Sequence, residues 1–114
     1  MTRIYKIMSQ DDWGSALAAG AYTGSAVDIA DGFIHLSAAD QAEETARRHF
    51  AGRGDLVLVA FEAEALGPGL RWEPSRGGAL FPHLYGPLPT AASLEVRRLS
   101  LDPDGAPEIG FLPA

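Results

Sequence analysis

The segment DLVLVAF, residues 55–61, is continuously apolar after its first residue and is rich in residues that favour β-strands. A half-buried strand alternates apolar and polar residues, whereas a strand covered on both faces carries an unbroken apolar run. We therefore predict that residues 55–61 form a strand at the centre of a β-sheet. The other elements are assigned outward from this strand in both directions.

One strand and one helix are predicted near the start of the chain. Residues 3–8, RIYKIM, alternate in the way that strand residues do. Ser9 suits the N-cap of a following helix, and Gly20 suits its C-terminal end. The side chains expected on the buried side of this helix are Trp13, Ala16 and Leu17. Residues 20–32 are rich in turn-forming residues, and we expect them to be irregular.

A second helix is predicted over residues 38–50. Ser37 suits its N-cap, and Asp40 follows three residues later, as in a weak capping box. Oppositely charged pairs at i,i+4 spacing are typical of a solvated outer face. The pairs at this spacing are Glu43–Arg47 and Glu44–Arg48. The inner face is expected to consist of Ala39, Ala42, Ala46 and Phe50.

The C-terminal half is predicted to be mainly extended. Pro82 has no N–H to donate within a ladder, so an edge strand or a bulge is expected around it. The alternation in residues 93–101 slips by one place at Arg97-Arg98, which indicates a bulge there. The extended segments are expected at residues 70–73, 79–86, 93–101 and, as an edge strand, 107–112. Helices followed by strands favour a single α+β domain spanning residues 1–114.

Length and composition limit the classes of function. The chain has 114 residues, a net charge of −6 and no cysteine, which excludes disulfides and thiolate catalysis. The acidic balance argues against non-specific nucleic-acid binding, because such binding depends on neutralising phosphates. The N-terminus lacks the pattern of a signal peptide, and no apolar run approaches the ~20 residues of a membrane span. We expect a soluble cytoplasmic protein without a membrane partner, and the oligomeric state stays open.

Two of the three histidines lie in the same short pattern, GFIHLS at residues 32–37 and LFPHLYG at residues 80–86. Alternate residues of a strand share a face. We call the face that carries each histidine the front of its segment. The front is predicted to consist of Phe33, His35 and Ser37 in the first segment and of Phe81, His83 and Tyr85 in the second. Buried imidazoles and hydroxyls each need a hydrogen-bond partner, whereas a cleft can use them to stack a ring and bind hydroxyls. We therefore expect both fronts to line one cleft.

A structural role is the alternative for both histidines, with their hydrogen bonds satisfied inside the core. The third histidine, His49, falls in the last turn of the second predicted helix, where a cationic imidazole suits the helix dipole. We expect His49 to be structural or at the surface. Because His49 lies away from the shared face, no metal site is predicted.

The segment RWEPSRGG, residues 71–78, is the densest polar cluster of the chain. Arg76 stands between Ser75 and the pair Gly77-Gly78, so backbone N–H groups and a guanidinium fork could together hold a phosphate or carboxylate. A plain glycine loop with a solvated arginine is the alternative.

Two further residues of this segment are candidates. Trp72 suits either the core or a surface that stacks a ring. Glu73 suits a general base or an acceptor for a ribose hydroxyl, although a lone carboxylate before proline is a weak signal.

The motifs DGFIHLS, LRWEPSRGG and FPHLYG, with the opening IYKI…W, resemble a small bacterial family known as domain of unknown function 952. The resemblance extends through GSAVDIADGFIHLSAADQAEETARRHF and covers nearly the whole chain. It implies an ADP-ribosyltransferase-like fold, in which a split, mostly antiparallel sheet holds NAD or a related nucleotide in a cleft. The two predicted helices of the N-terminal half would accompany this sheet.

The resemblance also implies roles for single residues. In the wider superfamily a histidine on an early strand contacts a ribose hydroxyl of NAD, and His35 is the matching position. Tyr85 or Trp72 would be the stacking aromatic residue, and His83 would replace another member of the usual triad. The late glutamate of the superfamily has only two unsupported candidates here, which are Glu95 and Glu108.

The leading expectation is an NAD-processing or ADP-ribosyl-transfer-like enzyme, with NAD as substrate and without a metal. Its catalytic residues would be His35, His83 and Glu73. Its substrate-binding residues would be Phe33, Ser37, Trp72, Ser75, Arg76, Gly77, Gly78 and Tyr85. The alternative is a non-catalytic module that binds a small nucleotide or an acidic metabolite.

Overall fold

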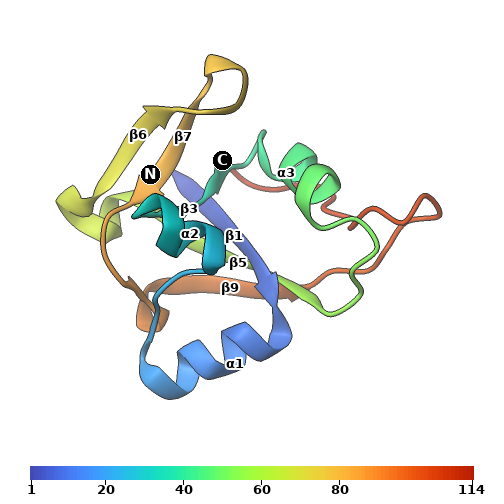
Figure 1. Ribbon diagram of the computed structural model, residues 1–114, viewed down its shortest axis with the longest axis horizontal. Helices are drawn as coiled ribbons and strands as arrows, with labels where there is room; N and C mark the ends of the chain where they lie inside the picture. Colours follow the sequence, from blue (N-terminus) through green and yellow to red (C-terminus); the bar gives the residue numbers. More distant parts are fainter.

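Strand β5 (Leu56–Glu62) lies between β1 (Arg3–Ser9) and β9 (Ser93–Arg98) in an antiparallel sheet of order β4-β1-β5-β9 (Figure 1). The structure is a computed structural model that describes residues 1–114. Every residue of β5 up to Phe61 is buried. The central position predicted for this segment is therefore confirmed.

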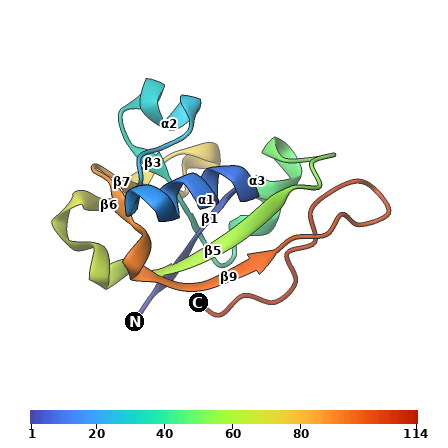
Figure 2. The same cartoon turned by 90° about the horizontal axis from the view of Figure 1, so that it is seen from below.

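The two faces of this sheet carry two separate cores. Helix α1 (Gln10–Ala19) covers one face, and α3 (Ala42–His49) with the C-terminal tail covers the other (Figure 2). Successive residues of β5 alternate between the cores: Val57, Val59 and Phe61 join Trp13 under α1, and the residues between them join Ala42 and Ala46 under α3. The unbroken apolar run follows from this double burial.

Two smaller antiparallel sheets complete the fold. Strand β3 (Ile34–His35) pairs with β7 (Leu80–Leu84), which also pairs with β6 (Leu70–Pro74). Strand β2 (Ala21–Tyr22) pairs with β8 (Leu88–Pro89). The remaining elements are β4 (Ser37–Ala38) and three short 3-10 helices, η1 (Ala63–Gly69), η2 (Arg76–Gly78) and η3 (Thr90–Ala92). The class is thus α+β with mostly antiparallel sheets, as predicted.

Both predicted ends of the first helix are confirmed. Ser9 accepts a hydrogen bond from the Asp12 backbone N–H, and Gly20 closes the helix with a positive φ of 86°. Trp13 and Ala16 are buried as expected, but Leu17 is exposed, so its assignment to the buried side is wrong.

Residues 20–32 are not irregular throughout, because a third α-helix, α2 (Ala26–Asp31), forms within them. Ser25 and Asp28 form a reciprocal capping box, and Gly32 ends the helix with a φ of 86°. The apolar residues Val27 and Ile29 of this helix are exposed, so the sequence shows no buried helical stripe there. The prediction of only two helices is wrong for this reason.

The second predicted helix starts later than expected. Helix α3 begins at Ala42, and its N-cap residue Gln41 makes no side-chain capping bond. Ser37 is not a cap, because it pairs with Tyr5 of β1 as part of β4 and is buried. Its hydroxyl donates to Thr45 Oγ1 at 3.2 Å instead.

Pro82 lies in the middle strand of its sheet, and the prediction of an edge is wrong. On the β6 side it faces Trp72. On the other side the Leu36 N–H donates to the Pro82 carbonyl at 3.0 Å, but Pro82 has no N–H to return a bond. The regular pairing of β3 with β7 ends there, and the chain passes on to pair with β1.

Two further expectations for the C-terminal half are corrected. Strand β9 has a bulge, but it lies where Glu95 pairs with Ala60 and Ser93 with Phe61, not at Arg97-Arg98. Residues 107–112 form no strand; Ile109 and Leu112 instead bury their side chains in the core under α3. None of the helices combines the length and apolar character that crossing a membrane requires.

Candidate functional site

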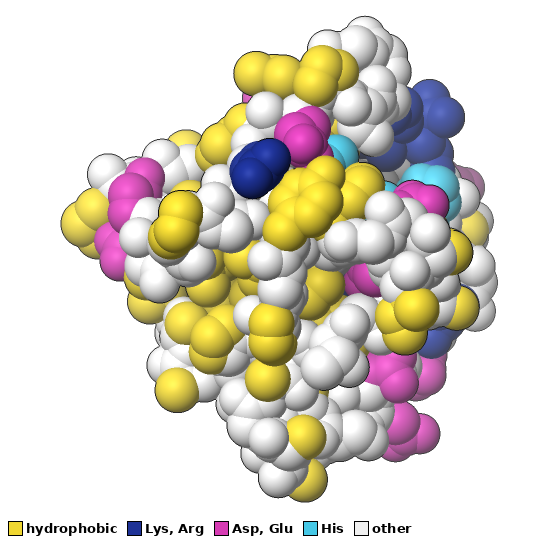
Figure 3. All heavy atoms as spheres, turned by 60° about the vertical axis from the view of Figure 1, so that its left-hand side comes forward, with side chains coloured by type: hydrophobic (Ala, Val, Ile, Leu, Met, Phe, Trp, Pro, Cys, Tyr) yellow, Lys and Arg dark blue, Asp and Glu magenta, His cyan; other side chains and the backbone are white.

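The structure brings the two predicted fronts together. His35 and His83 are direct partners in the pairing of β3 with β7, and their ring centroids lie 5.5 Å apart. The Phe33 ring stacks on His83 at 4.1 Å and contacts His35 at 4.5 Å. Tyr85 lies 5.3 Å from the same ring. Histidine side chains appear beside apolar and charged groups at the surface in Figure 3.

His35 is oriented by a buried carboxylate on α2. Asp28 Oδ1 lies 2.7 Å from His35 Nδ1 and also accepts from the His35 backbone N–H at 3.1 Å. The carboxylate further accepts from the Ser25 backbone N–H and from Lys6 Nζ at 3.1 Å. A carboxylate can only accept, so His35 Nδ1 carries the proton of this contact.

Lys6 completes this buried network. Its Nζ donates to the His35 carbonyl at 2.8 Å as well as to Asp28. Burial lowers the pKa of Lys6 although the Asp28 charge opposes the change. Burial alone would raise the pKa of Asp28, but the Lys6 ammonium and hydrogen bonds from Ser25 and His35 hold it below its ordinary value. Burial thus favours loss of the Lys6 proton, the Asp28 charge opposes that loss, and the carboxylate of Asp28 is favoured in its ionised form.

His83 is oriented by a second carboxylate, which belongs to β6. Glu73 Oε1 lies 2.8 Å from His83 Nδ1 and accepts from the Tyr85 hydroxyl at 2.8 Å. The hydrogen bond from His83, followed by that from Tyr85, lowers the pKa of Glu73. The bond to Glu73 in turn raises the pKa of Tyr85. Glu73 therefore positions His83, and only its Oε2 lacks a partner within the protein.

The second ring nitrogens of the two histidines have different surroundings. His35 Nε2 lies 3.0 Å from Asp31 Oδ2, a carboxylate that is half exposed. His83 Nε2 is buried and has no hydrogen-bond partner. An unpartnered buried nitrogen is unusual in a folded protein.

Both histidines line a cleft of about 860 Å³ that extends from α2 to α3 and η2. The cleft is basic in an acidic protein: its lining contains four of the nine Lys and Arg residues but one of the fifteen Asp and Glu residues. The basic residues are Lys6, Arg48, Arg53 and Arg76. The single acidic residue, Asp28, is already paired with Lys6. The lining itself is therefore rich in positive charge, which Glu44 beside Arg48 and Arg76 and Asp55 beside Arg53 partly balance from outside it.

The other predicted site residues divide into two groups. Phe81, Ser37, Ser75 and Arg76 line the cleft. Gly77 and Gly78 are exposed and do not line it, and the Gly78 N–H donates to the Ser75 carbonyl. Trp72 pairs with Pro82 and so lies on the face of β6 opposite to Glu73. The glycine backbone and Trp72 are thus outside the cleft, and Phe33, Glu73 and Tyr85, which were also predicted to be site residues, do not line it.

Several residues that line the cleft were not predicted from the sequence. Asp28 was part of a segment predicted to be irregular, and Lys6 appeared as one polar position in a strand. His49, Arg48 and Thr45 line the cleft although α3 was expected to have a solvated outer face there. The signal available in the sequence was the spacing of Ser25 and Asp28, which fits a capping box.

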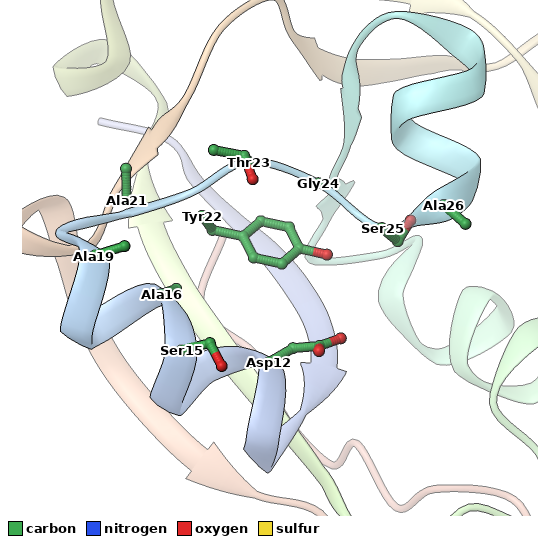
Figure 4. Close-up of a pocket in the computed structure, with 10 residues that line it drawn as sticks. All are labelled: Asp12, Ser15, Ala16, Ala19, Ala21, Tyr22, Thr23, Gly24, Ser25 and Ala26. Carbon is green, nitrogen blue, oxygen red and sulfur yellow. The ribbon is translucent and has the colours of Figure 1, made fainter.

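A second pocket of about 430 Å³ lies between α1 and the segment that leads into α2. The Tyr22 ring extends across it, with its hydroxyl toward Ser25 (Figure 4). Burial raises the pKa of this hydroxyl. The walls are mostly alanine and hydroxyl side chains, and Asp12 is the only charged one. Ser25 also lines the larger cleft, so the two pockets adjoin.

Comparison with known proteins places the chain in a family. Residues 7–96 match the family model described as protein of unknown function (DUF952). The chain belongs to this family. Its structure is similar to crystal structures of protein CC0527 from Caulobacter crescentus and of a double mutant of that protein, with identities of 57% and 55%. In both cases 96% of each chain is covered and the TM-score is 0.94.

The chain is also similar to the solution NMR structure of CC0527 from Caulobacter crescentus. It is 57% identical, covers 96% of this chain and 95% of its own, and has a TM-score of 0.87. No curated protein matches the chain. The DUF952 fold is therefore represented by experimental structures of a close relative.

Proposed function

We propose that the histidine-lined cleft binds a phosphate-bearing, nucleotide-like ligand and that this DUF952 protein is an NAD-processing or ADP-ribosyl-transfer-like enzyme. The observation that carries the proposal is the pair of imidazoles, 5.5 Å apart, each held by a carboxylate at Nδ1 in one basic cleft. Carboxylate-held histidines present Nε2 for hydrogen bonding or proton transfer. The positive charge suits the phosphates of such a ligand.

In this proposal the two histidines have different tasks. His35 binds a ribose hydroxyl in place of the half-exposed Asp31, and His83 Nε2, which is unpartnered but enclosed, accepts the proton once ligand binding exposes it. The bond between the nicotinamide and the ribose breaks, the oxygen of water or an acceptor forms the new bond to the same carbon, and its proton passes to His83. Nicotinamide leaves with the electron pair of the broken bond. Glu73, which was predicted to be catalytic, contributes by holding His83 from outside the cleft.

A non-catalytic binding module is the second candidate, and one contact favours it. Asp31 Oδ2 lies 3.0 Å from His35 Nε2, and the Phe33 ring stacks on the His83 ring. Both histidines are thus engaged within the protein itself. A module of this kind would bind the same ligands without converting them.

Calorimetric titration with NAD, ADP-ribose and nicotinamide tests the proposal, together with an assay for released nicotinamide. We expect saturable binding, a loss of turnover in His83→Ala, and at least about tenfold weaker binding in His35→Ala. Binding without turnover would support the module instead. If none of the three compounds binds at millimolar concentration, the nucleotide proposal fails.

A structural role for the histidines has its own signature in the same variants. If both substitutions lower the melting temperature and neither changes ligand binding, the histidines serve the core alone. Thermal unfolding of each variant should therefore accompany the titrations.

A further inference from the structure

A single carboxylate on α3 faces three arginines at one end of the cleft. Glu44 Oε2 lies 3.5 Å from Arg76 Nε and 3.7 Å from Arg48 Nε, and Glu44 Oε1 lies 3.4 Å from Arg47 Nη2. Arg48 and Arg76 line the cleft and Arg47 does not, so one negative charge stands against two positive charges there and leaves an excess of one. The cluster therefore has the charge to bind a further anion.

The contacts of Glu44 with Arg48 and Arg76 are loose. A hydrogen bond between a guanidinium and a carboxylate is normally about 2.7–2.9 Å long. Both Nε distances are well above this range. The donor capacity of the two guanidinium groups is therefore largely unused.

Arg76 is held in place by contacts other than its ion pair. Its guanidinium lies over the Phe81 ring at 5.0 Å, and its Nη1 donates to Thr45 Oγ1 at 3.4 Å. Its side chain is only 24% exposed. A stacked, partly buried guanidinium is oriented before any ligand arrives, which reduces the entropy lost on binding.

The Thr45 hydroxyl adds a neutral donor to this end of the cleft. Its oxygen accepts from both Arg76 Nη1 and Ser37 Oγ. A hydroxyl has one proton to donate, and these two bonds leave that proton free. Thr45, Arg48 and Arg76 all line the cleft, whereas Arg47 does not.

We infer that Arg48, Arg76 and Thr45 form a phosphate subsite and that Glu44, which lies beside the cleft without lining it, competes for the two arginines when no ligand is bound. A phosphate oxygen of the ligand replaces Glu44 Oε2 between the two arginines. This inference rests on the proposed function and specifies it further: the ligand carries its phosphate or diphosphate at the α3 end, away from the histidines. It also replaces the glycine backbone as the expected phosphate site.

Titration of the full chain with inorganic diphosphate, by calorimetry, tests the subsite without reference to NAD. We expect Arg48→Gln and Arg76→Gln to weaken binding at least about tenfold, because each removes a charge-assisted contact. Glu44→Gln should tighten binding about two- to fivefold, since the competing carboxylate is lost. Arg47→Gln is the matched control: it contacts the same carboxylate from the same helix, lies outside the cleft, and should leave binding within about twofold of wild type.

Absence of diphosphate binding by the wild-type protein would overturn the subsite. Two further results would also overturn it once thermal unfolding has shown that the variants are folded. One is unchanged diphosphate binding in both Arg48→Gln and Arg76→Gln. The other is weaker binding in Glu44→Gln, which would mean that Glu44 orders the arginines instead of competing with the ligand. Diphosphate binding that needs both arginines, combined with no binding of NAD, would retain the subsite and reject the NAD proposal. NAD binding that is unchanged in both Arg48→Gln and Arg76→Gln would retain the NAD proposal and reject the subsite.

Discussion

The Asp28–His35 and Glu73–His83 pairs have the same carboxylate-to-Nδ1 contact but opposite burial. Asp28 is 2% exposed and its histidine 31%, whereas Glu73 is 32% exposed and its histidine 4%. In the first pair the carboxylate belongs to the interior and the imidazole reaches solvent. In the second pair the imidazole is enclosed and the carboxylate reaches solvent.

This difference separates two kinds of contribution to one site. Asp28 holds Lys6, the start of α2 and His35 in place at once, so the local fold depends on it. Glu73 contacts only two side-chain groups, on His83 and Tyr85, and water can replace either bond. The first carboxylate should matter mainly for stability and the second mainly for the proton position on its histidine.

Asp28→Asn should produce the largest change. It leaves the Lys6 ammonium buried without a counter-charge, and breaking a buried ion pair in this way typically costs about 3–5 kcal/mol. Urea unfolding at pH 7 measures the loss. A cost below about 1 kcal/mol would contradict the central role given to Asp28.

Lowering the pH should destabilise the fold by protonating the same carboxylate, that of Asp28. The pKa of Asp28 in the folded protein is below its ordinary value, so ionised Asp28 stabilises the fold fully above the unfolded pKa of about 4. This stabilisation is lost as pH falls through the lower, folded pKa. The free energy of unfolding should therefore fall most steeply below about pH 4, and the fall should be shallower in Asp28→Asn. Equal slopes in the two proteins would assign acid sensitivity to other groups.

Ser25→Ala tests the helix that presents Asp28. It removes the hydroxyl that accepts from the Asp28 N–H but keeps the bond from the Ser25 N–H to the carboxylate. Loss of an N-cap side chain typically costs about 1 kcal/mol. Urea unfolding should show this smaller loss, and Ser25→Thr, which keeps the hydroxyl, should recover most of it. No recovery would mean that the cap is not the cause.

Glu73→Ala should change stability least of the four experiments, because the side chain is one-third exposed. Its effect should appear on His83, whose Nδ1 loses its acceptor. Imidazole nitrogen NMR at a fixed pH above 7 should show the proton on Nδ1 in the wild type and a mixture of both tautomers in the variant. An unchanged spectrum would show that Glu73 does not position the ring, and His35 in the same spectra serves as an internal control.

The parts of the fold that could be predicted are those with one local cause. The β5 run is apolar because two cores cover it, and Ser9 and Gly20 mark the ends of α1 through their own capping geometry. Helix α2 has no such stripe, since Val27 and Ile29 face solvent and its only buried residue is the charged Asp28. Its stability comes from contacts with Lys6 and His35, which no local pattern records.

The site, like the fold, could be predicted only where a local sequence pattern determined it. The repeated frame around His35 and His83 indicated that their faces meet, and the structure places the rings together. Ser37 lines the cleft as predicted although the chain pairs with β7 before Leu36 and with β1 after it, whereas Phe33 and Tyr85 do not line the cleft. Face alternation holds within one sheet, and this segment leaves one sheet for another. The partners Asp28 and Lys6 were hidden because a polar residue gains its role from distant neighbours.

The sequence separations within the site bear on how it folds. Asp28 and His35 are seven residues apart and Glu73 and His83 ten, so each pair can form within its own stretch of chain. Joining the pairs requires closure of a loop of about 50 residues between β3 and β7, and such non-local contacts form slowly. During synthesis each carboxylate can therefore meet its histidine early. The cleft itself can exist only after β7 has emerged from the ribosome and docked.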